Sequence, residues 1–478
     1  MTETQKLETK KYLPWVVGLI ILLDSLYFRT AALRHTGYWI DEMSSVHFAG
    51  HERWSALFWD NSPPLYHFIL KFWMKAFGNF EVATRSLSAI FSTTCTVLWM
   101  RFGFKRHGLI GLVFFGLCHA IYSLSISHGR ETRMYALFEL ASTNLFFIFV
   151  DLFEGTAVSK TRKFSSVLFA LLTHALALLP ILVGFGFLIF KNKISLSIRQ
   201  KWALGSATIF VISITLYYVR LDNLGWQQFK FEMEPASHWP WLVIYEILQG
   251  AVGATAAVLA LLLAIATARK GQRTSSLTIL FWAFFVTIFA AATLAGFISA
   301  RSVFLTRYFF FLTPLLIYLM VNPFLEYRGQ PARFYKMTAA LFLLLFMSGE
   351  LMASLKVVEA ENADWRGAAD IVAQTDRPKI YTTLPLSMRS PYFDAYKIEF
   401  EKIAIYTPTI FEPLLEGFKQ KYDVWIIENY WGFYVVAQSF NEFTKKHNCT
   451  WRDYTLRSDK AEPVVLIQVF CGDSAIGL

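Results

Sequence analysis

The sequence has few charged residues and no internal repeat. Only 17% of its 478 residues are Asp, Glu, Lys or Arg, whereas 55% are hydrophobic and 17% are aromatic. Soluble domains carry about 25% charged residues, so this composition excludes an ordinary soluble protein and indicates a polytopic membrane protein. The lack of a repeat weakens a transporter fold, because such folds are often built from duplicated halves.

Acidic residues are fewer than basic ones, 35 against 45, which gives a formal net charge of +10. The Lys and Arg residues fall mainly in short loops between apolar runs, where they orient a protein against the membrane. We therefore interpret the positive charge as a topology signal and expect no nucleic-acid partner. No small-residue cleavage site follows the first apolar run, so we expect a retained span with a cytoplasmic N-terminus.

Several apolar runs are about long enough to cross a hydrocarbon core of roughly 30 Å as a helix. Basic loops flank the run at 164–190 on both sides, so the positive-inside bias predicts that it crosses twice, turning around Thr173 and His174. One long helix there is the alternative. With the hairpin, about 11 transmembrane helices result, and the C-terminus lies outside. The runs lie near 13–29, 83–100, 108–127, 134–153, 164–190, 202–218, 241–268, 276–299, 308–326 and 337–355.

The composition becomes that of a soluble protein from about residue 356. Asp364 is typical of a helix start, and β-branched runs at 379–382, 424–427 and 464–470 predict strands. We expect a small extracytoplasmic α/β domain over 356–478. It would follow a transmembrane domain over 1–355 that has outer interfacial loops at 30–82 and 219–240.

Cys449 and Cys471 are the only cysteines outside the predicted spans. An oxidising outer compartment would permit them to pair, and their spacing leaves the pairing open.

Asp41 and Glu42 are adjacent carboxylates just beyond the first span. In such a place one carboxylate can take a proton while the other holds a ligand or an ion. A solvated loop or a helix cap is the alternative interpretation.

The order of several motifs resembles the lipid-linked-sugar glycosyltransferases of the GT-C type, in particular family 39, the branch of the protein mannosyltransferases and aminoarabinose transferases. The resemblance covers nearly the whole chain. It implies sugar transfer from a polyprenyl-phosphate donor to an acceptor hydroxyl on the outer face, with Asp41 as general base, inversion at the sugar, and Glu42 orienting the acceptor or binding a cation. The motifs are Asp41-Glu42, Ser62-Pro63-Pro64-Leu65-Tyr66, Gly78 with Glu81 and Arg85, Arg130-Glu131-Thr132-Arg133, Thr173-His174, Arg307-Tyr308 and Asp364-Trp365-Arg366.

A donor phosphate near the membrane surface needs cationic partners, and a guanidinium can form two parallel hydrogen bonds to phosphate oxygens. Arg307 with Tyr308 fits this role, and Arg301 lies on the same predicted turn. Both arginines could instead extend to lipid headgroups. Arg130 and Arg133 could bind the phosphate, pair with Glu131, or pair with a carboxylate of the first loop.

Asp60, Tyr66 and His174 are candidates for the acceptor pocket. Asp60 could instead cap a helix, and His174 could be a structural histidine, because Ala175 follows it where the family commonly has an aromatic residue. We expect no dedicated metal site. Whether the Asp41–Glu42 pair binds Mg²⁺ or Mn²⁺ stays open.

Two other functions remain possible on the sequence: a lipid or solute transporter or flippase, and a non-catalytic partner in envelope glycan assembly. Glu139, Glu246 and Glu350 are the few acidic residues deep within spans that a transporter would need. The expected partners are a polyprenyl-phosphate-linked sugar, a glycan, glycolipid or protein acceptor, and membrane lipids. The resemblance implies a multi-pass protein of the bacterial plasma membrane.

Overall fold

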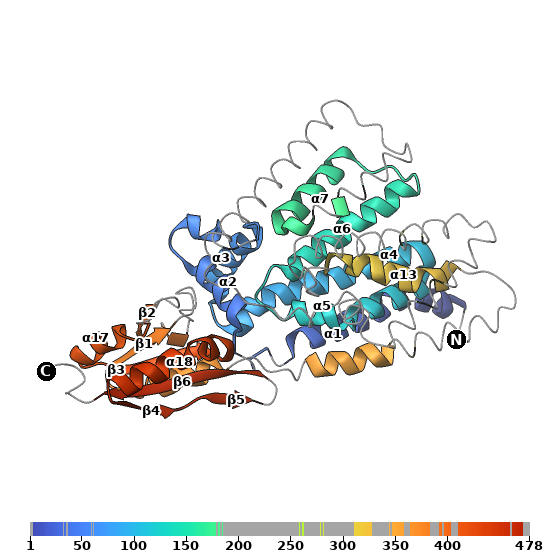
Figure 1. Cartoon of the computed structure of the whole chain (residues 1–478). Helices are drawn as coiled ribbons and strands as arrows, with labels where there is room; N and C mark the ends of the chain where they lie inside the picture. The colour runs from blue at the N-terminus through green and yellow to red at the C-terminus, as the bar shows by residue number, and fades with distance from the viewer. Residues whose placement is uncertain are drawn as a thin grey trace.

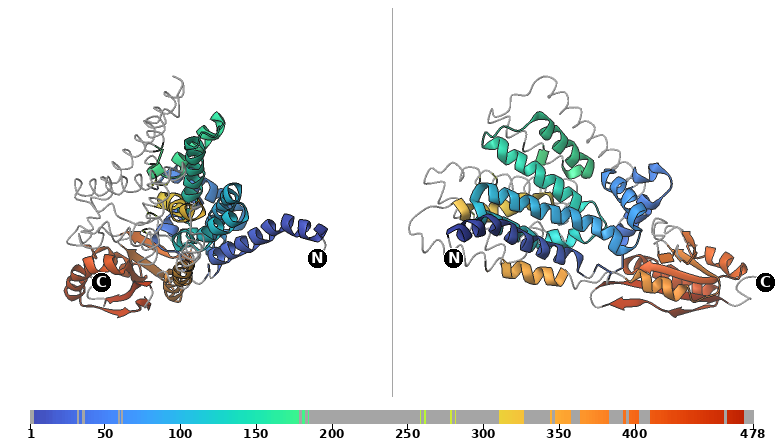
Figure 2. Two further views of the ribbon diagram at one scale, coloured as in Figure 1. Left: turned by 90° about the vertical axis from the view of Figure 1, so that its right-hand side faces the viewer. Right: turned by 180° about the vertical axis from the view of Figure 1, so that it is seen from behind.

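The structure is a computed structural model in which a helical bundle carries a β-sheet at one end (Figure 1). The N-terminus lies at the end of the bundle away from the sheet, as the view from behind also shows (Figure 2). The described residues are 3–31, 33–34, 37–58, 60, 62–177, 180–181, 184, 258, 261, 278, 281, 310–326, 344, 347–357, 364–382, 392–393, 396–402, 410–458 and 461–471.

Long apolar helices form the described bundle. Two of them, Tyr12–Thr30 within α1 and Tyr135–Phe153 (α6), are long and apolar enough to cross a membrane, and a third span results if α4 and α5 are counted as one broken span. They match the spans predicted at 13–29 and 134–153, because a long run of apolar side chains suits a helix that crosses a membrane. The bundle elements are α1 (Glu3–Thr30), α4 (Glu81–Ala120), α5 (Ser123–Gly129), α6, α7 (Lys160–Thr173), η2 (Ala175–Ala177) and α13 (Thr313–Glu326).

The helix α4 contains a chain reversal at Gly108, whose φ of 63° is readily adopted only by glycine. Beyond the reversal the chain runs back alongside the first part of α4, as the stacked rings of Trp99 and Phe115 show, with centroids 5.3 Å apart. Gly103 and Gly111 touch so closely that a side chain on either would clash with the other's carbonyl group. The reversal therefore separates the two runs expected at 83–100 and 108–127.

Short helices follow the first span. They are α2 (Ile40–Gly50), the 3-10 turn η1 (Trp54–Phe58) and α3 (Leu65–Phe77), with Pro64 immediately before α3. Lys71 of α3 is buried and donates from Nζ to the carbonyl oxygens of Ala49 and His51. A cation suits this position because the C-terminal carbonyls of α2 carry partial negative charge.

The sheet has the strand order β2-β1-β3-β6-β4, with β5 also paired to β6. Pairing is parallel between β1 and β2 and between β1 and β3, and antiparallel for the pairs that involve β6. Cys449 and Cys471 face each other across β4 and β6 and form a disulfide. The elements are α15 (Trp365–Val372), β1 (Pro378–Thr382), β2 (Glu399–Lys402), α17 (Pro413–Lys419), β3 (Asp423–Asn429), α18 (Tyr430–Lys446), β4 (Cys449–Asp453), β5 (Leu456–Ser458) and β6 (Ala461–Cys471).

The strand β3 buries side chains on both faces of the sheet, since successive side chains of a strand point to opposite sides. Trp425 and Ile427 of β3 join one apolar cluster with α15, whereas Val424 and Ile426 join another with α17 and α18. The first cluster also contains Met43 and Val46 of α2. One face of the sheet is thus covered partly by a helix from the N-terminal part of the chain.

Several sequence predictions lie wholly or mostly outside the described residues: the spans at 202–218, 241–268 and 276–299, the loop at 219–240, and Arg301, Arg307 and Tyr308. The span at 337–355 is described at 344 and over 347–355, where it is helical. The break predicted around Thr173 and His174 falls where α7 ends, and His174 is in an extended conformation.

Candidate functional site

Asp41 and Glu42 are the second and third residues of α2, which begins after the extended residue Trp39. Consecutive helical residues differ by about 100° in direction, so their side chains enter different surroundings. Asp41 remains partly exposed, whereas Glu42 is fully buried. The two neighbours in sequence therefore have separate environments.

Glu42 is held by the guanidinium of Arg85. Its Oε1 accepts from Arg85 Nε at 2.8 Å, and its Oε2 accepts from Arg85 Nη2 at 2.6 Å. The backbone N–H groups of Thr132 and Trp39 donate to the same carboxylate. Because these contacts use both oxygens, Glu42 suits a positioning role better than the acceptor or cation contact expected from sequence. The dipeptide does not present two open carboxylates to one divalent cation.

A second buried ion pair lies beside Asp41. Arg133 Nη1 is 3.2 Å from Asp60 Oδ2, 3.0 Å from Ser45 Oγ and 3.2 Å from the carbonyl oxygen of Asp41. Burial lowers the pKa of Arg133, but the negative charges of Asp60 and Asp41 outweigh burial and raise it. The sequence left open whether Arg133 pairs with Glu131, with a carboxylate of the first loop or with the donor phosphate. In the structure its partner is Asp60, a carboxylate of the loop at 30–82.

His67 was not singled out in the sequence, and the structure places it next to this pair. It is fully buried on α3, and its Nε2 is 3.4 Å from Asp60 Oδ2. Burial lowers the pKa of His67 to about 4, against the opposing effect of Asp60, so the ring is neutral at neutral pH. Within the described part of the chain, neither ring nitrogen of His67 nor Arg133 Nε has a hydrogen-bond partner.

We call Asp41, Ser45, Asp60, His67 and Arg133 the junction cluster. A buried nitrogen without a partner is unfavourable by about 1–3 kcal/mol, so a group of such nitrogens beside carboxylates is typical of a site for a polar ligand. The sequence signal for His67 was weak, because it is a single histidine on a helix face that also buries Leu70.

Tyr66, His174 and Arg130 make structural contacts in the described structure. The hydroxyl of Tyr66 is 3.2 Å from Ser88 Oγ, and the ring of His174 stacks on Phe138 with centroids 4.6 Å apart. His174 also lies within electrostatic reach of Arg133 and Asp60. Arg130 Nη1 donates to the carbonyl oxygens of Phe28 and Ala31, so it ties the end of α1 to the turn before α6.

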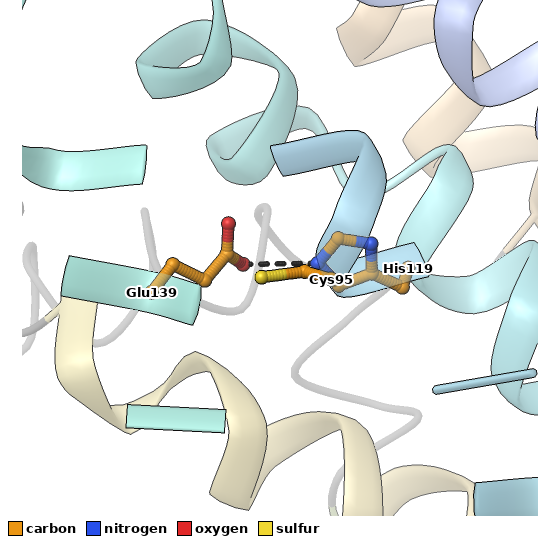
Figure 3. A group of neighbouring side chains, drawn as sticks. All are labelled: Cys95, His119 and Glu139. Carbon is orange, nitrogen blue, oxygen red and sulfur yellow. Dashed lines mark hydrogen bonds and ion pairs between the residues drawn. The ribbon is translucent and has the colours of Figure 1, made fainter. Parts of the chain in front are cut away.

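Cys95, His119 and Glu139 form a further group inside the bundle, with their potential ligand atoms within 4.8 Å of one another (Figure 3). His119 Nε2 is 3.1 Å from Glu139 Oε1, and His119 Nδ1 is 2.9 Å from Thr96 Oγ1. Both ring nitrogens are thus already hydrogen-bonded. Arg29 interacts electrostatically with Glu139, and its positive charge opposes a cation in this group. We interpret the group as a buried polar network.

No protein-family model matches the sequence, and a comparison with curated proteins finds no match. Two crystal structures of ArnT from Cupriavidus metallidurans resemble the fold. The apo structure has a TM-score of 0.56 at 13% identity, covering 96% of this chain and 98% of that one. The structure bound to undecaprenyl phosphate has a TM-score of 0.55 at 14% identity, covering 95% and 97%. These likenesses show the fold, a polytopic helical membrane architecture over almost the whole of both chains.

Proposed function

We propose that the protein transfers a monosaccharide from a polyprenyl-phosphate donor to an acceptor hydroxyl, with inversion at the sugar. The fold likeness to ArnT, which has been crystallised with undecaprenyl phosphate, supports this class of donor. The motif order resembling GT-C glycosyltransferases of family 39 points the same way. A glycan or glycolipid is the proposed acceptor.

One observation carries the proposal: the partly exposed carboxylate of Asp41 belongs to the junction cluster, in which Arg133 Nε and the ring nitrogens of His67 have no hydrogen-bond partner among the described residues. A general base must be accessible to the acceptor hydroxyl, and Asp41 is more exposed than Glu42 or Asp60. The unpaired nitrogens of Arg133 and His67 offer hydrogen bonds to hydroxyl or phosphate oxygens. A substrate would satisfy groups that the described protein leaves unsatisfied.

In the proposed reaction, Asp41 takes the proton of the acceptor hydroxyl while the oxygen of that hydroxyl attacks the anomeric carbon of the sugar. The bond from that carbon to the phosphate oxygen breaks, and polyprenyl phosphate leaves with the bonding electrons. Direct displacement inverts the anomeric configuration. Cationic groups stabilise the charge that develops on the leaving phosphate. Arg307, Tyr308 and Arg301, which lie outside the described residues, are proposed for this role, together with Arg133 and Arg130 of the turn before α6.

We place the protein in the bacterial inner membrane, with residues 1–355 forming the membrane-embedded catalytic domain. The N-terminus is proposed to be cytoplasmic and the domain over 356–478 extracytoplasmic. Nucleotide-sugar donors are confined to the cytoplasm, which explains why an outer site would use a lipid-linked donor.

The deep acidic residues favour this function over transport. Glu139 accepts hydrogen bonds from His119 and Ser125, and Glu350 accepts one from the backbone N–H of Ser123 at 2.9 Å. A transporter needs ionisable groups that exchange partners along a pathway. Here these two carboxylates have structural partners.

The test is transfer of radiolabelled sugar by the purified protein from a polyprenyl-phosphate donor, together with mass spectrometry of copurified lipid. Asp41→Asn removes the base, and we expect turnover to fall by about 100-fold or more. Asp376→Asn, the same change at an exposed residue outside the site, is the matched control. Unchanged turnover in a folded Asp41→Asn protein would falsify the assignment of the base.

A further inference from the structure

The helix that carries Asp41 packs against the sheet at the other end of the sequence. Met43 and Val46, three residues apart on one side of α2, lie in the apolar cluster formed by Trp365, Trp425 and Leu466. Residues three apart share a face of a helix. Asp41 and Ser45 share a different face, the one that Arg133 contacts. The orientation of Asp41 about the helix axis is thus coupled to the packing of the sheet.

A polar contact joins the same two parts of the chain. Glu81, the first residue of α4, accepts hydrogen bonds from Arg366 of α15 and from the hydroxyl of Tyr392. The Tyr392 oxygen in turn accepts from the backbone N–H of Tyr38 at 3.1 Å. Glu81 is mostly buried, whereas the Arg366 side chain is 39% exposed. The start of α4, the helix α15 and Tyr392 therefore meet at the carboxylate of Glu81, and Tyr392 links them to Tyr38, two residues before α2.

The network continues along α4 to the residues that flank Asp41. The hydroxyl of Tyr38 is 2.7 Å from Thr84 Oγ1, which is 2.8 Å from Thr132 Oγ1. One turn from Glu81, Arg85 binds Glu42, and Glu42 also accepts from the backbone N–H of Thr132. Arg133 is the next residue. Hydrogen bonds, together with the covalent chain at Tyr38, thus connect the sheet region to Glu42 and to Thr132, the neighbours in sequence of Asp41 and Arg133.

We propose that the sheet region fixes the orientation of α2, the helix that carries Asp41, through the contact of Arg366 and Tyr392 with Glu81. Arg366 and Tyr392 are thus positioning residues for Asp41. The proposal rests on the proposed function for its kinetic consequence only. Arg366 and Tyr392 themselves are not placed in contact with substrate. A shift of about 1 Å in a reacting group can lower turnover by about 100-fold, so loosening α2 acts on the chemical step.

The test uses full-length Arg366→Ala and Tyr392→Phe proteins, with Arg366→Lys as the conservative variant. We expect amide hydrogen exchange within 38–50 to accelerate at least about 10-fold in the first two. We also expect kcat to fall about 10-fold with KM for the donor unchanged. Arg366→Lys should restore part of both, because an ammonium still pairs with Glu81. Lys446→Ala, which breaks the exposed ion pair with Glu412 in the same region, is the control.

Two results overturn the proposal. Exchange within 38–50 that matches the wild type in both variants shows that the contact does not hold α2. If kcat falls only in proportion to the fraction of folded protein, Arg366 and Tyr392 have a purely structural role. If the wild type transfers no sugar, the proposed function fails, and the exchange measurement alone still decides whether the sheet holds the helix.

Discussion

Arg29 and Arg133 are both buried guanidinium groups, one inside the helical bundle and one where the bundle meets the sheet. Arg29 donates from all three of its nitrogens, to Ser92 Oγ, Ser25 and the carbonyl oxygens of Ala120 and His119. Arg133 donates from Nη1, and its Nε has no hydrogen-bond partner within the described residues. We call the network of Arg29, Ser25, Ser92, Thr96, His119 and Glu139 the bundle cluster.

This difference in hydrogen bonding assigns a structural role to the bundle cluster and a functional role to the junction cluster. In the bundle cluster the nitrogens of Arg29 and both ring nitrogens of His119 are paired, whereas Glu139 Oε2 has no hydrogen-bond partner among the described residues. A network that is largely paired fixes how helices pack and leaves little for a ligand. A cluster with unpaired buried nitrogens is unfavourable for folding and persists most readily where a ligand binds. The bundle cluster therefore predicts effects on stability, and the junction cluster predicts effects on turnover.

The largest expected effect is that of Arg133→Met in the junction cluster. It removes a cation beside Asp41 and leaves Asp60 buried without its charge partner. We expect sugar transfer to fall by about 100-fold or more, because one lost electrostatic contact in a site has that effect. Transfer per folded molecule is the measurement. Arg133→Lys retains the charge, so a protein as inactive as the methionine variant shows that the planar guanidinium itself is needed.

The next effect is that of Arg29→Met in the bundle cluster. It removes the guanidinium that donates to Ser92 Oγ and to the carbonyl oxygens of Ala120 and His119, and with it a positive charge that interacts electrostatically with Glu139. Each buried polar group left without its partner is unfavourable by about 1–3 kcal/mol. We expect a lower melting temperature in detergent with unchanged transfer per folded molecule. Arg101→Met, at an exposed arginine, is the control. A well-folded but inactive Arg29→Met protein contradicts the separation between the two clusters.

The smallest effect concerns the pH dependence of stability at His67. The folded pKa of about 4 lies below the value of about 6.5 in the unfolded chain, so between these values only the unfolded state binds the proton. Stability is therefore lost as the pH falls from about 6.5 to 4, by up to roughly 3 kcal/mol. His67→Phe should flatten this part of the stability curve.

Denaturation midpoints at pH 7 and pH 4.5 measure the effect. His447→Phe, at a partly exposed histidine that pairs with Glu412, tests whether any histidine gives the same result. An unchanged slope for His67→Phe argues that folding does not lower the pKa of His67.

Much of the fold follows from local sequence. Apolar length predicted the helices α1, α6 and α13, and the boundary between the runs expected at 83–100 and 108–127 lies at the reversal that Gly108 makes. Asp364 caps α15 by accepting from the backbone N–H of Gly367 at 2.8 Å, as its position before an apolar run indicated. The β-branched runs predicted β1, β3 and β6. Each of these depends on neighbours a few residues away.

The candidate site was predictable only in part. Sequence singled out Asp41, Asp60 and Arg133, and the structure brings them together. It did not indicate His67, and Arg85 was noted only as part of a motif.

The sequence by itself determined which segments are apolar, where helices begin, and which residues carry charge. Only the tertiary structure decided that Glu42 pairs with Arg85, 43 residues away, that Asp60 pairs with Arg133, 73 residues away, and that α2 covers the sheet. The physical reason is that periodicity gives the direction of a side chain and not its partner. Which of two adjacent carboxylates stays accessible depends on which cation the fold brings to the other.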